Sequence, residues 1–211
     1  MPGFDPYQLS TIADQMRERH LAAVEAAREL ADTSVTPCPV EVEPSCRRTE
    51  QDNFEKQNSI APGCGYYRRR YNNFIERQPD LTPPTYYLEY GEKYCNKFTD
   101  ETFHNLSSEG QKWLTEVKCG LQENIEKLLQ NPDKRYLEYL EKDFADATFA
   151  THAPVYLENG LADITLGDQF TIGSTPLKEF FWGDHKAATW KQAGEVLPDV
   201  VDGWKRNYLG I

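Results

Sequence analysis

Apolar side chains recur at helical spacing near the start of the chain, in residues 7–30. The positions that make up this stripe are Leu9, Ile12, Met16, Ala23, Ala27 and Leu30. The alanines, arginines and glutamates between them favour a helix. Because Asp32-Thr33-Ser34 follows directly and is typical of a helix end, we predict one N-terminal helix within residues 1–34.

The same spacing returns three times in the second half of the chain. Residues 85–106 carry tyrosines and a phenylalanine every three or four positions, and residues 107–131 carry a stripe of Trp113, Leu114, Val117, Leu121, Ile125 and Leu128. Ser107 or Ser108 fits the N-cap of this second helix, and Asn131 fits its end. A third helix would begin near Pro132, forming a helical hairpin with the second.

Between these helices, residues 35–84 hold many prolines and three of the five cysteines. We expect an irregular arm packed on the helical body, with helical turns near 50–57 and 69–78. After Pro154 the segments shorten, and residues 161–173 fit a helix or a strand. The predicted class is therefore mostly α: a single compact domain with an N-terminal helix (1–34), an irregular arm (35–84) and a helical body (85–211).

The formal net charge of −11 over 211 residues makes duplex nucleic acid and anionic membranes unsuitable partners for the whole molecule. No stretch approaches the roughly 18 apolar residues of a membrane span. The start of the sequence, MPGFDPYQLS, lacks the basic and apolar regions of a signal peptide. We therefore expect a cytoplasmic protein, or one exported without a cleavable signal peptide.

One local exception to the acidic balance is the stretch YYRRRYNN, whose candidate binding residues are Tyr66, Tyr67, Arg68, Arg69 and Arg70. Arginines between tyrosines are typical of sites that bind phosphate or single-stranded nucleic acid. In a chain with 34 carboxylates, the simpler interpretation is that these arginines are solvated or paired, and we favour it.

The five cysteines do not have the Cys-x-x-Cys spacing of zinc or redox sites, and we expect neither a metal nor a cofactor. Cys95 and Cys119 fall on neighbouring predicted helices, so a disulfide between them is a candidate. Two buried free thiols are an equally ordinary alternative. An odd number of cysteines leaves at least one thiol free within a monomer.

His152 begins the one stretch that resembles a known family, over about nine residues. The pattern consists of His152, Val155, Tyr156, Leu157, Asn159 and Gly160. It resembles the histidine strand of cysteine peptidoglycan endopeptidases, which would imply a thiol nucleophile at Cys64 or Cys119. The chain shows no alternating strand series to carry such a histidine, so we favour His152 as the end of a helix, followed by a turn at Asn159-Gly160.

Phosphate-binding glycine loops, zinc-protease motifs and nucleophile elbows are absent from the sequence. Tyrosine and tryptophan, which are enriched in protein interfaces, are plentiful. The sequence therefore favours an acidic helical protein that acts by binding another protein, without catalysis. The alternative is an exported cysteine hydrolase or cell-wall-degrading effector that uses Cys64 or Cys119 with His152.

Overall fold

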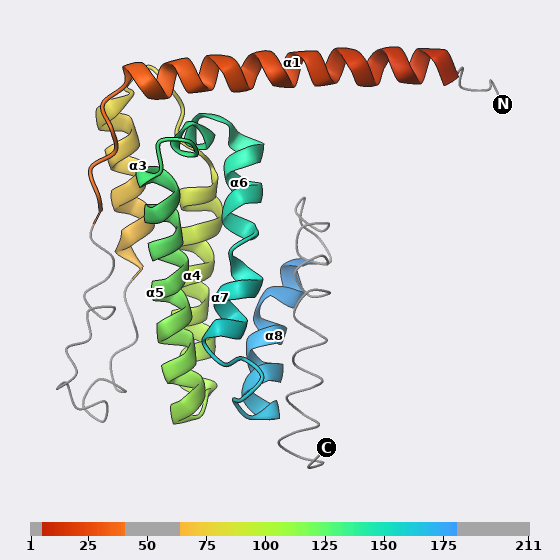
Figure 1. The fold of residues 1–211 in the computed structure, drawn as a ribbon. Coiled ribbons are helices and arrows are strands. Elements are labelled where there is room, and N and C mark those ends of the chain that lie inside the picture. The colour runs from red at the N-terminus through yellow and green to blue at the C-terminus, as the bar shows by residue number, and fades with distance from the viewer. Residues whose placement is uncertain (1–5, 41–63, 181–211) are drawn as a thin grey trace.

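The structure, a computed structural model, describes residues 6–40 and 64–180, and within these ranges the side chains of 13–40 and 64–175. The described residues are mostly helical and include no strand, which confirms the predicted class. Helix α1 (Pro6–Thr33) crosses one end of an upright helical bundle and extends far beyond it (Figure 1).

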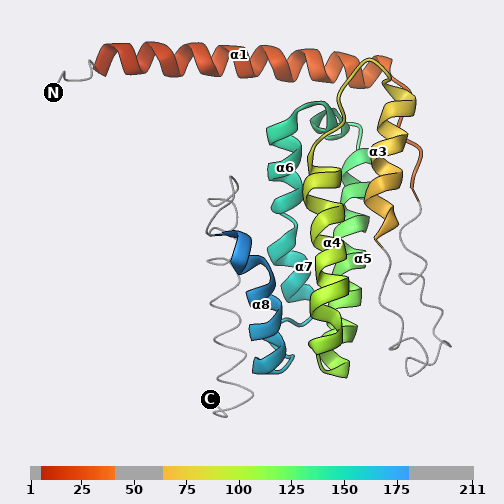
Figure 2. The same cartoon turned by 180° about the vertical axis from the view of Figure 1, so that it is seen from behind.

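The bundle runs alternately up and down, as the two opposite views show (Figures 1 and 2). Its elements, in chain order, are α3 (Gly65–Arg77), η2 (Tyr86–Glu92), α4 (Lys93–Lys97), η3 (Phe98–Thr102), η4 (Phe103–Asn105), α5 (Ser108–Gln130), η5 (Arg135–Tyr139), α6 (Glu141–Phe149), α7 (His152–Glu158) and α8 (Leu166–Phe180). Of residues 161–173, for which the sequence fits a helix or a strand, 166–173 are helical and lie in α8, whereas 161–165 form a turn before it.

Helix α5 is the central element and matches its sequence prediction closely. The Ser107 hydroxyl caps it by accepting a hydrogen bond from the Gly110 N–H at 3.2 Å, and Asn131 is its C-cap. The predicted stripe is buried, with Leu121 only partly so. The chain then returns antiparallel through α6 and α7, so the expected hairpin is present (Figure 1).

The stretch expected as one helix over residues 85–106 is helical throughout, but π-helical turns interrupt it at η2 and η3. The ring of Tyr67, on α3, packs on η2 and explains why η2 contains Gly91. A Cβ atom at Gly91 would lie 2.3 Å from Cδ1 of Tyr67, so only glycine lets the two elements approach this closely.

The third predicted helix is broken, because the backbone at Leu140 is extended between the 3₁₀ turn η5 and α6. His152 was expected in the last turn of that helix, and this prediction is wrong: His152 is the first residue of α7. Pro154 lies in the first turn of α7. N–H groups in the first turn of a helix have no acceptor within the helix, so the missing N–H of proline removes no hydrogen bond there. Gly160, with φ of 81°, forms the turn that Asn159-Gly160 predicted.

The helical turn expected near residues 69–78 is present, but it belongs to a longer helix of the bundle and not to an irregular arm. Helix α3 lies within residues 35–84 and buries Tyr66, Tyr67 and Phe74 against the body. Residues 34–40 follow α1 without regular structure, as expected. The helical turn considered near residues 50–57 lies outside the described residues.

Two apolar clusters form the described core. The first is aromatic and joins α3, η2, α5 and α6 around Tyr66, Tyr87 and Phe144. The second surrounds Trp113 and joins the start of α5 to η4, α7 and α8. The Trp113 indole N–H donates a 3.2 Å hydrogen bond to the Tyr156 carbonyl oxygen, so this side chain both fills space and orients α7.

Replacing Trp113 tests this packing. Trp113→Ala should lower the free energy of unfolding by about 3–5 kcal/mol, because it opens a cavity in a core position that is only 2% exposed. Lys112→Ala, at the neighbouring exposed position, should lower it by less than about 0.5 kcal/mol. Equal losses in a urea titration of the two variants would contradict the packing.

Candidate functional site

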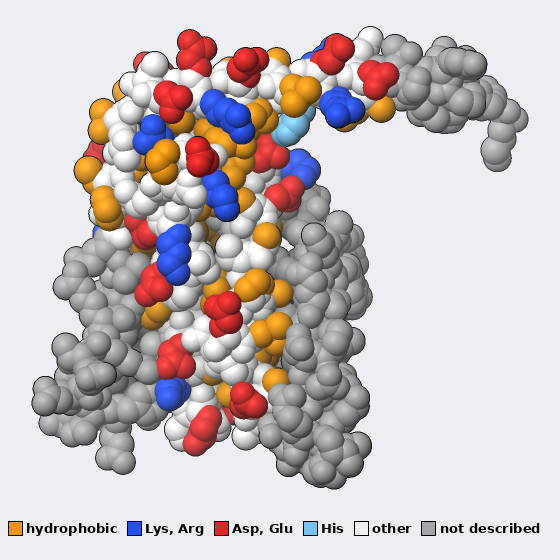
Figure 3. All heavy atoms as spheres, viewed as in Figure 1, with side chains coloured by type: hydrophobic (Ala, Val, Ile, Leu, Met, Phe, Trp, Pro, Cys, Tyr) orange, Lys and Arg blue, Asp and Glu red, His pale blue; other side chains and the backbone are white. Residues whose placement is uncertain are grey.

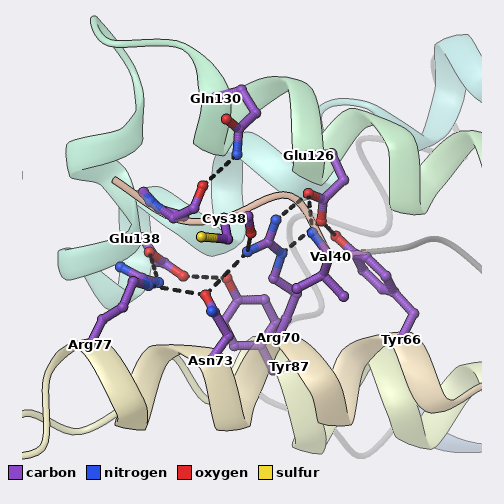
Figure 4. A network of polar contacts seen from close by, with 11 residues as sticks. Cys38, Val40, Tyr66, Arg70, Asn73, Arg77, Tyr87, Glu126, Gln130 and Glu138 are labelled. Atoms are coloured by element: carbon purple, nitrogen blue, oxygen red, sulfur yellow. Dashed lines mark hydrogen bonds and ion pairs between the residues drawn. The ribbon is translucent and has the colours of Figure 1, made fainter. Parts of the chain in front are cut away.

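Three of the five candidate binding residues lie in the core. Tyr66, Tyr67 and Arg70 are buried, because they share the face of α3 that carries Phe74 four residues further on. The polar atoms of Tyr66 and Arg70 belong to a network that joins α3, α5 and the segment after α1 (Figure 4). These three side chains are therefore structural in the described protein.

Arg70 and Glu126 are the centre of this network. Arg70 Nε donates to Glu126 Oε1 at 2.6 Å, and a second guanidinium nitrogen pairs with Oε2 of the same carboxylate. The remaining nitrogen donates to the Cys38 carbonyl oxygen at 3.1 Å and to Asn73 Oδ1 at 3.3 Å. Burial alone would lower the pKa of Arg70, but the hydrogen bonds and charge of Glu126 raise it above its ordinary value.

Glu126 also accepts hydrogen bonds from a second residue of α3 and from the segment after α1. It accepts hydrogen bonds from Tyr66 Oη at 2.6 Å and from the Val40 backbone N–H at 3.1 Å. Burial and the adjacent carboxylate raise the pKa of Tyr66 well above its usual value, so this hydroxyl remains a donor. One carboxylate thereby connects α5 to α3 and to residues 38–40.

A second buried ion pair continues the network toward the C-terminal end of α3. Arg77 donates to Glu138 Oε2 at 2.8 Å, and Tyr87 Oη donates to Glu138 Oε1 at 2.7 Å. Arg77 Nε also donates to Asn73 Oδ1 at 3.0 Å, which links the two pairs. Burial and the Glu138 charge raise the pKa of Tyr87 well above its usual value.

The other two candidate binding residues, Arg68 and Arg69, are exposed. Arg68 forms a two-point contact with the Glu92 carboxylate, one part of which is a 3.0 Å hydrogen bond from Nε. The simpler interpretation of the arginine stretch therefore describes Arg68 and Arg70, which both pair with carboxylates. Sequence reasoning missed Glu126 because it lies 56 residues from Arg70 in the chain.

The cysteines pair differently from the candidate bridge. Cys95 is bonded to Cys64, with the two Cα atoms 5.7 Å apart, so the proposed Cys95–Cys119 pair is not the one formed. Cys119 is also disulfide-bonded, and its partner lies outside the described residues. Cys38 is a free, exposed thiol. Both thiols considered as nucleophiles, Cys64 and Cys119, are therefore oxidised in this structure.

Lys118 is a buried cation beside the Cys64–Cys95 disulfide, and the sequence analysis did not identify it. Its ammonium group donates to Cys64 Sγ at 3.3 Å and to the Thr99 hydroxyl. A signal was available, because Lys118 lies four residues after Leu114 and seven before Ile125, inside the apolar stripe of α5. A charge within such a stripe indicates a polar partner in the core.

His152 lies in a cage of aromatic rings. It is only 5% exposed, and its Nε2 lies 3.4 Å from Tyr86 Oη. The rings of Tyr90, Phe149 and Tyr156 pack around it at centroid distances of 5.4 to 6.3 Å. Burial raises the pKa of Tyr156 to about 12. These contacts describe a core histidine that packs α7 on η2 and α6.

An open pocket of about 370 Å³ lies between α5 and α7. Its wall carries the carboxylates of Glu116, Glu123 and Glu158 together with Lys127, and the disulfide-bonded Cys119. Within the described ranges, no group of three or more histidine, cysteine, aspartate or glutamate side chains is placed to hold a metal ion. No described helix combines the length and apolarity needed to cross a membrane.

The projecting part of α1 is exposed along its described length. Ala27 and Ala31 are buried on the bundle, whereas every residue from 13 to 23 is exposed. His20, near the point where α1 leaves the body, lies 3.9 Å from Asp143 of α6. In the space-filling view this helix extends away from a body whose visible face mixes acidic and basic side chains (Figure 3).

Asp168 is a buried carboxylate that joins α8 to the start of α5. It accepts hydrogen bonds from the Ser107 N–H at 2.8 Å, the Ser107 hydroxyl at 2.6 Å and the Thr165 hydroxyl at 2.7 Å. Burial alone would raise the pKa of Asp168, but these hydrogen bonds outweigh it and lower the pKa. Gly110 provides the space, since a Cβ there would lie 2.7 Å from Asp168 Cγ.

Comparison with protein-family models, with curated proteins and with solved structures finds no match to this chain. Function must therefore be inferred from the chain's own residues.

Breaking the central ion pair should destabilise the protein strongly. Arg70→Met should lower the free energy of unfolding by about 3–5 kcal/mol, because it leaves the Glu126 carboxylate without its counter-charge inside the protein. Arg68→Met, which breaks a pair with an exposed arginine, should change the unfolding midpoint little. If Arg68→Met proved as damaging as Arg70→Met in denaturant titration, the burial of the Arg70 network would be in doubt.

The lowered pKa of Asp168 predicts a dependence of stability on acid. Because the folded-state pKa lies below the ordinary aspartate value of about 3.9, the ionised group stabilises the fold above that pH. The contribution disappears as the pH falls through the folded-state pKa. Asp168→Asn should therefore be less stable than the parent by about 1–3 kcal/mol at pH 7. The difference should shrink as the pH falls below the ordinary aspartate pKa of about 3.9. A difference that stays constant from pH 7 to pH 2.5 in urea titrations would contradict this.

Proposed function

We propose that this protein is a binding module that docks another protein through the projecting part of α1. The observation that supports this most is the unbroken exposure of residues 13–23 within a helix of 28 residues. At about 1.5 Å per residue the helix is about 42 Å long, and only its C-terminal part rests on the bundle (Figure 1). Such a helix presents a long surface that is accessible to a partner from all sides.

Helix energetics support a bound state for this segment. A helix that lacks tertiary contacts is only marginally stable in water, since most helical stability in proteins comes from packing an apolar face. The exposed segment carries large apolar side chains, with Met16 66% and Leu21 58% exposed. Docking against an apolar surface would bury Met16 and supply the packing that the free helix lacks.

The arrangement of charges on α1 defines the chemistry of the partner. At 100° per residue, Met16 and His20 continue the face that Ala27 and Ala31 bury on the bundle. Arg17 and Arg19 flank this face on opposite sides. The acidic residues nearby, Asp14 and Glu18, lie on the back of the helix. The complementary partner is a protein with an apolar groove and acidic edges.

The disulfides support action in an oxidising compartment. The protein contains the Cys64–Cys95 disulfide and a second disulfide formed by Cys119. Disulfides persist in compartments where thiols are not kept reduced, such as a periplasm or the outside of the cell. We therefore propose export over a cytoplasmic location.

The hydrolase alternative has less support. A cysteine hydrolase needs a thiolate within hydrogen-bond reach of its histidine. Cys64 and Cys119 are bonded, and His152 packs among tyrosine and phenylalanine rings. The binding module needs only the exposed helix and a stable body.

The docking proposal is tested with matched variants of the full chain. A partner found by crosslinking from the native source is purified and titrated against the parent protein, Met16→Asp and Glu18→Gln. Met16→Asp should weaken binding at least about tenfold, because it removes apolar contact and places a carboxylate opposite an acidic edge. Glu18→Gln, on the back of the helix, should leave the affinity unchanged.

Hydrogen exchange provides the second measurement. Amides of residues 13–23 should exchange quickly in the free protein and slowly in the purified complex, because docking opposes helix opening. A partner that binds both variants equally and leaves these amides unprotected would contradict the proposal. Sedimentation as a stable dimer through α1 would also contradict it, since the partner would then be a second copy.

A further inference from the structure

The Cys64 sulfur of the Cys64–Cys95 disulfide has polar neighbours. Lys118, only 6% exposed, places its ammonium group 3.3 Å from Cys64 Sγ. The Thr99 hydroxyl lies 3.4 Å from the same sulfur and donates to the Cys95 carbonyl oxygen at 2.8 Å. A cation and a hydroxyl therefore both contact the Cys64 sulfur.

Cys64 also occupies the N-cap position of α3, a helix of 13 residues. The N-terminus of a helix carries partial positive charge and favours an anion. Cys95 has no such position, because it lies in the middle of α4, with π-helical turns before and after it. Negative charge is thus stabilised on Cys64 by Lys118 and by α3.

We propose that Cys64–Cys95 is a redox-active pair that a small thiol opens in the folded protein, with Cys64 as the sulfur that leaves. The rate of thiol–disulfide exchange rises when the leaving thiolate is stabilised. The position of the Lys118 ammonium group beside Cys64 Sγ favours Cys64 as the sulfur that leaves. This proposal rests on the cysteine pair alone and is independent of docking through α1.

The exchange proceeds in two steps. A thiolate of the small thiol attacks Cys95 Sγ, the disulfide bond breaks, and its electron pair goes to Cys64 Sγ beside the Lys118 ammonium. Cys95 then carries a mixed disulfide. A second small thiolate attacks the outer sulfur of that mixed disulfide, releasing the oxidised small thiol and a Cys95 thiolate, which takes a proton from water. Two small thiols are oxidised to one disulfide, and the protein pair gains two electrons.

The fold does not depend on this disulfide alone to hold α3. Tyr66 and Phe74 anchor the helix in the core, and the Arg70–Glu126 pair binds it to α5. Opening the disulfide removes one link between α3 and α4 and leaves these contacts in place. These contacts would keep α3 docked on the body while the pair is reduced and re-formed.

The test uses the full native chain in glutathione redox buffers at pH 7, with rapid alkylation and peptide mapping of Cys64 and Cys95. The parent pair should open while circular dichroism stays native. Lys118→Met should make the pair at least about tenfold harder to reduce, which is about 30 mV for this two-electron couple. Lys112→Met removes the same charge from an exposed position of α5 and should have no effect. Equal midpoints for the two variants would overturn the proposal, as would opening that occurs only with loss of the native spectrum.

A second measurement serves if Lys118→Met fails to fold. In the Cys95→Ser background, the Cys64 thiol should react with iodoacetamide at pH 7 about tenfold faster than in the same background with Lys118→Gln. Lys118→Arg should restore most of the rate, because it returns the positive charge. Equal rates for Lys118 and Lys118→Gln would overturn the role of the lysine, and with it the proposal.

Discussion

The buried Arg70–Glu126 ion pair is the interaction on which the arrangement of the molecule depends. Moving two charges out of water is unfavourable unless their remaining hydrogen-bonding groups are satisfied. Here Cys38 O and Asn73 accept from the arginine, while Tyr66 and the Val40 N–H donate to the carboxylate. The pair is stable only when α3, α5 and residues 38–40 all meet, so it favours one arrangement over other apolar packings of the same helices.

The position of α1 follows from the same network. Residues 34–40 connect α1 to the body, and their polar atoms are held at several points along it. Gln130 donates to the Pro37 carbonyl at 2.7 Å, and Gln78 donates to the Ser34 hydroxyl at 2.6 Å. With its C-terminal end held in this way, α1 leaves the bundle in a defined direction (Figure 1). A projecting helix held this firmly at its base loses less freedom on docking than a flexible tail would.

Sequence periodicity predicted elements whose stability is local, and failed where the decisive contact is distant. Helix α5 follows from its stripe and its Ser107 cap, which all lie within 24 residues. The prolines and cysteines of residues 35–84 predict an irregular arm with only a helical turn near residues 69–78, where the structure has the whole helix α3. The buried face of α3 contains Arg70, whose partner lies 56 residues away in the chain. His152 was placed at a helix end for a similar reason. The Tyr86 hydroxyl of η2, which lies 3.4 Å from His152 Nε2, is 66 residues away in the chain.

The body has several independent contacts that hold α3, so the proposed opening of the disulfide and the proposed docking through α1 do not require the fold to be lost. Closing the 31-residue loop between Cys64 and Cys95 adds about 3–4 kcal/mol by restricting the unfolded chain. Losing the Arg70–Glu126 pair would have an effect of similar size. Because the two links hold α3 at different points, the Arg70–Glu126 pair still connects α3 to α5 when the disulfide is opened. Neither link involves residues 13–23, so the exposed part of α1 can bind a partner in both redox states of the body.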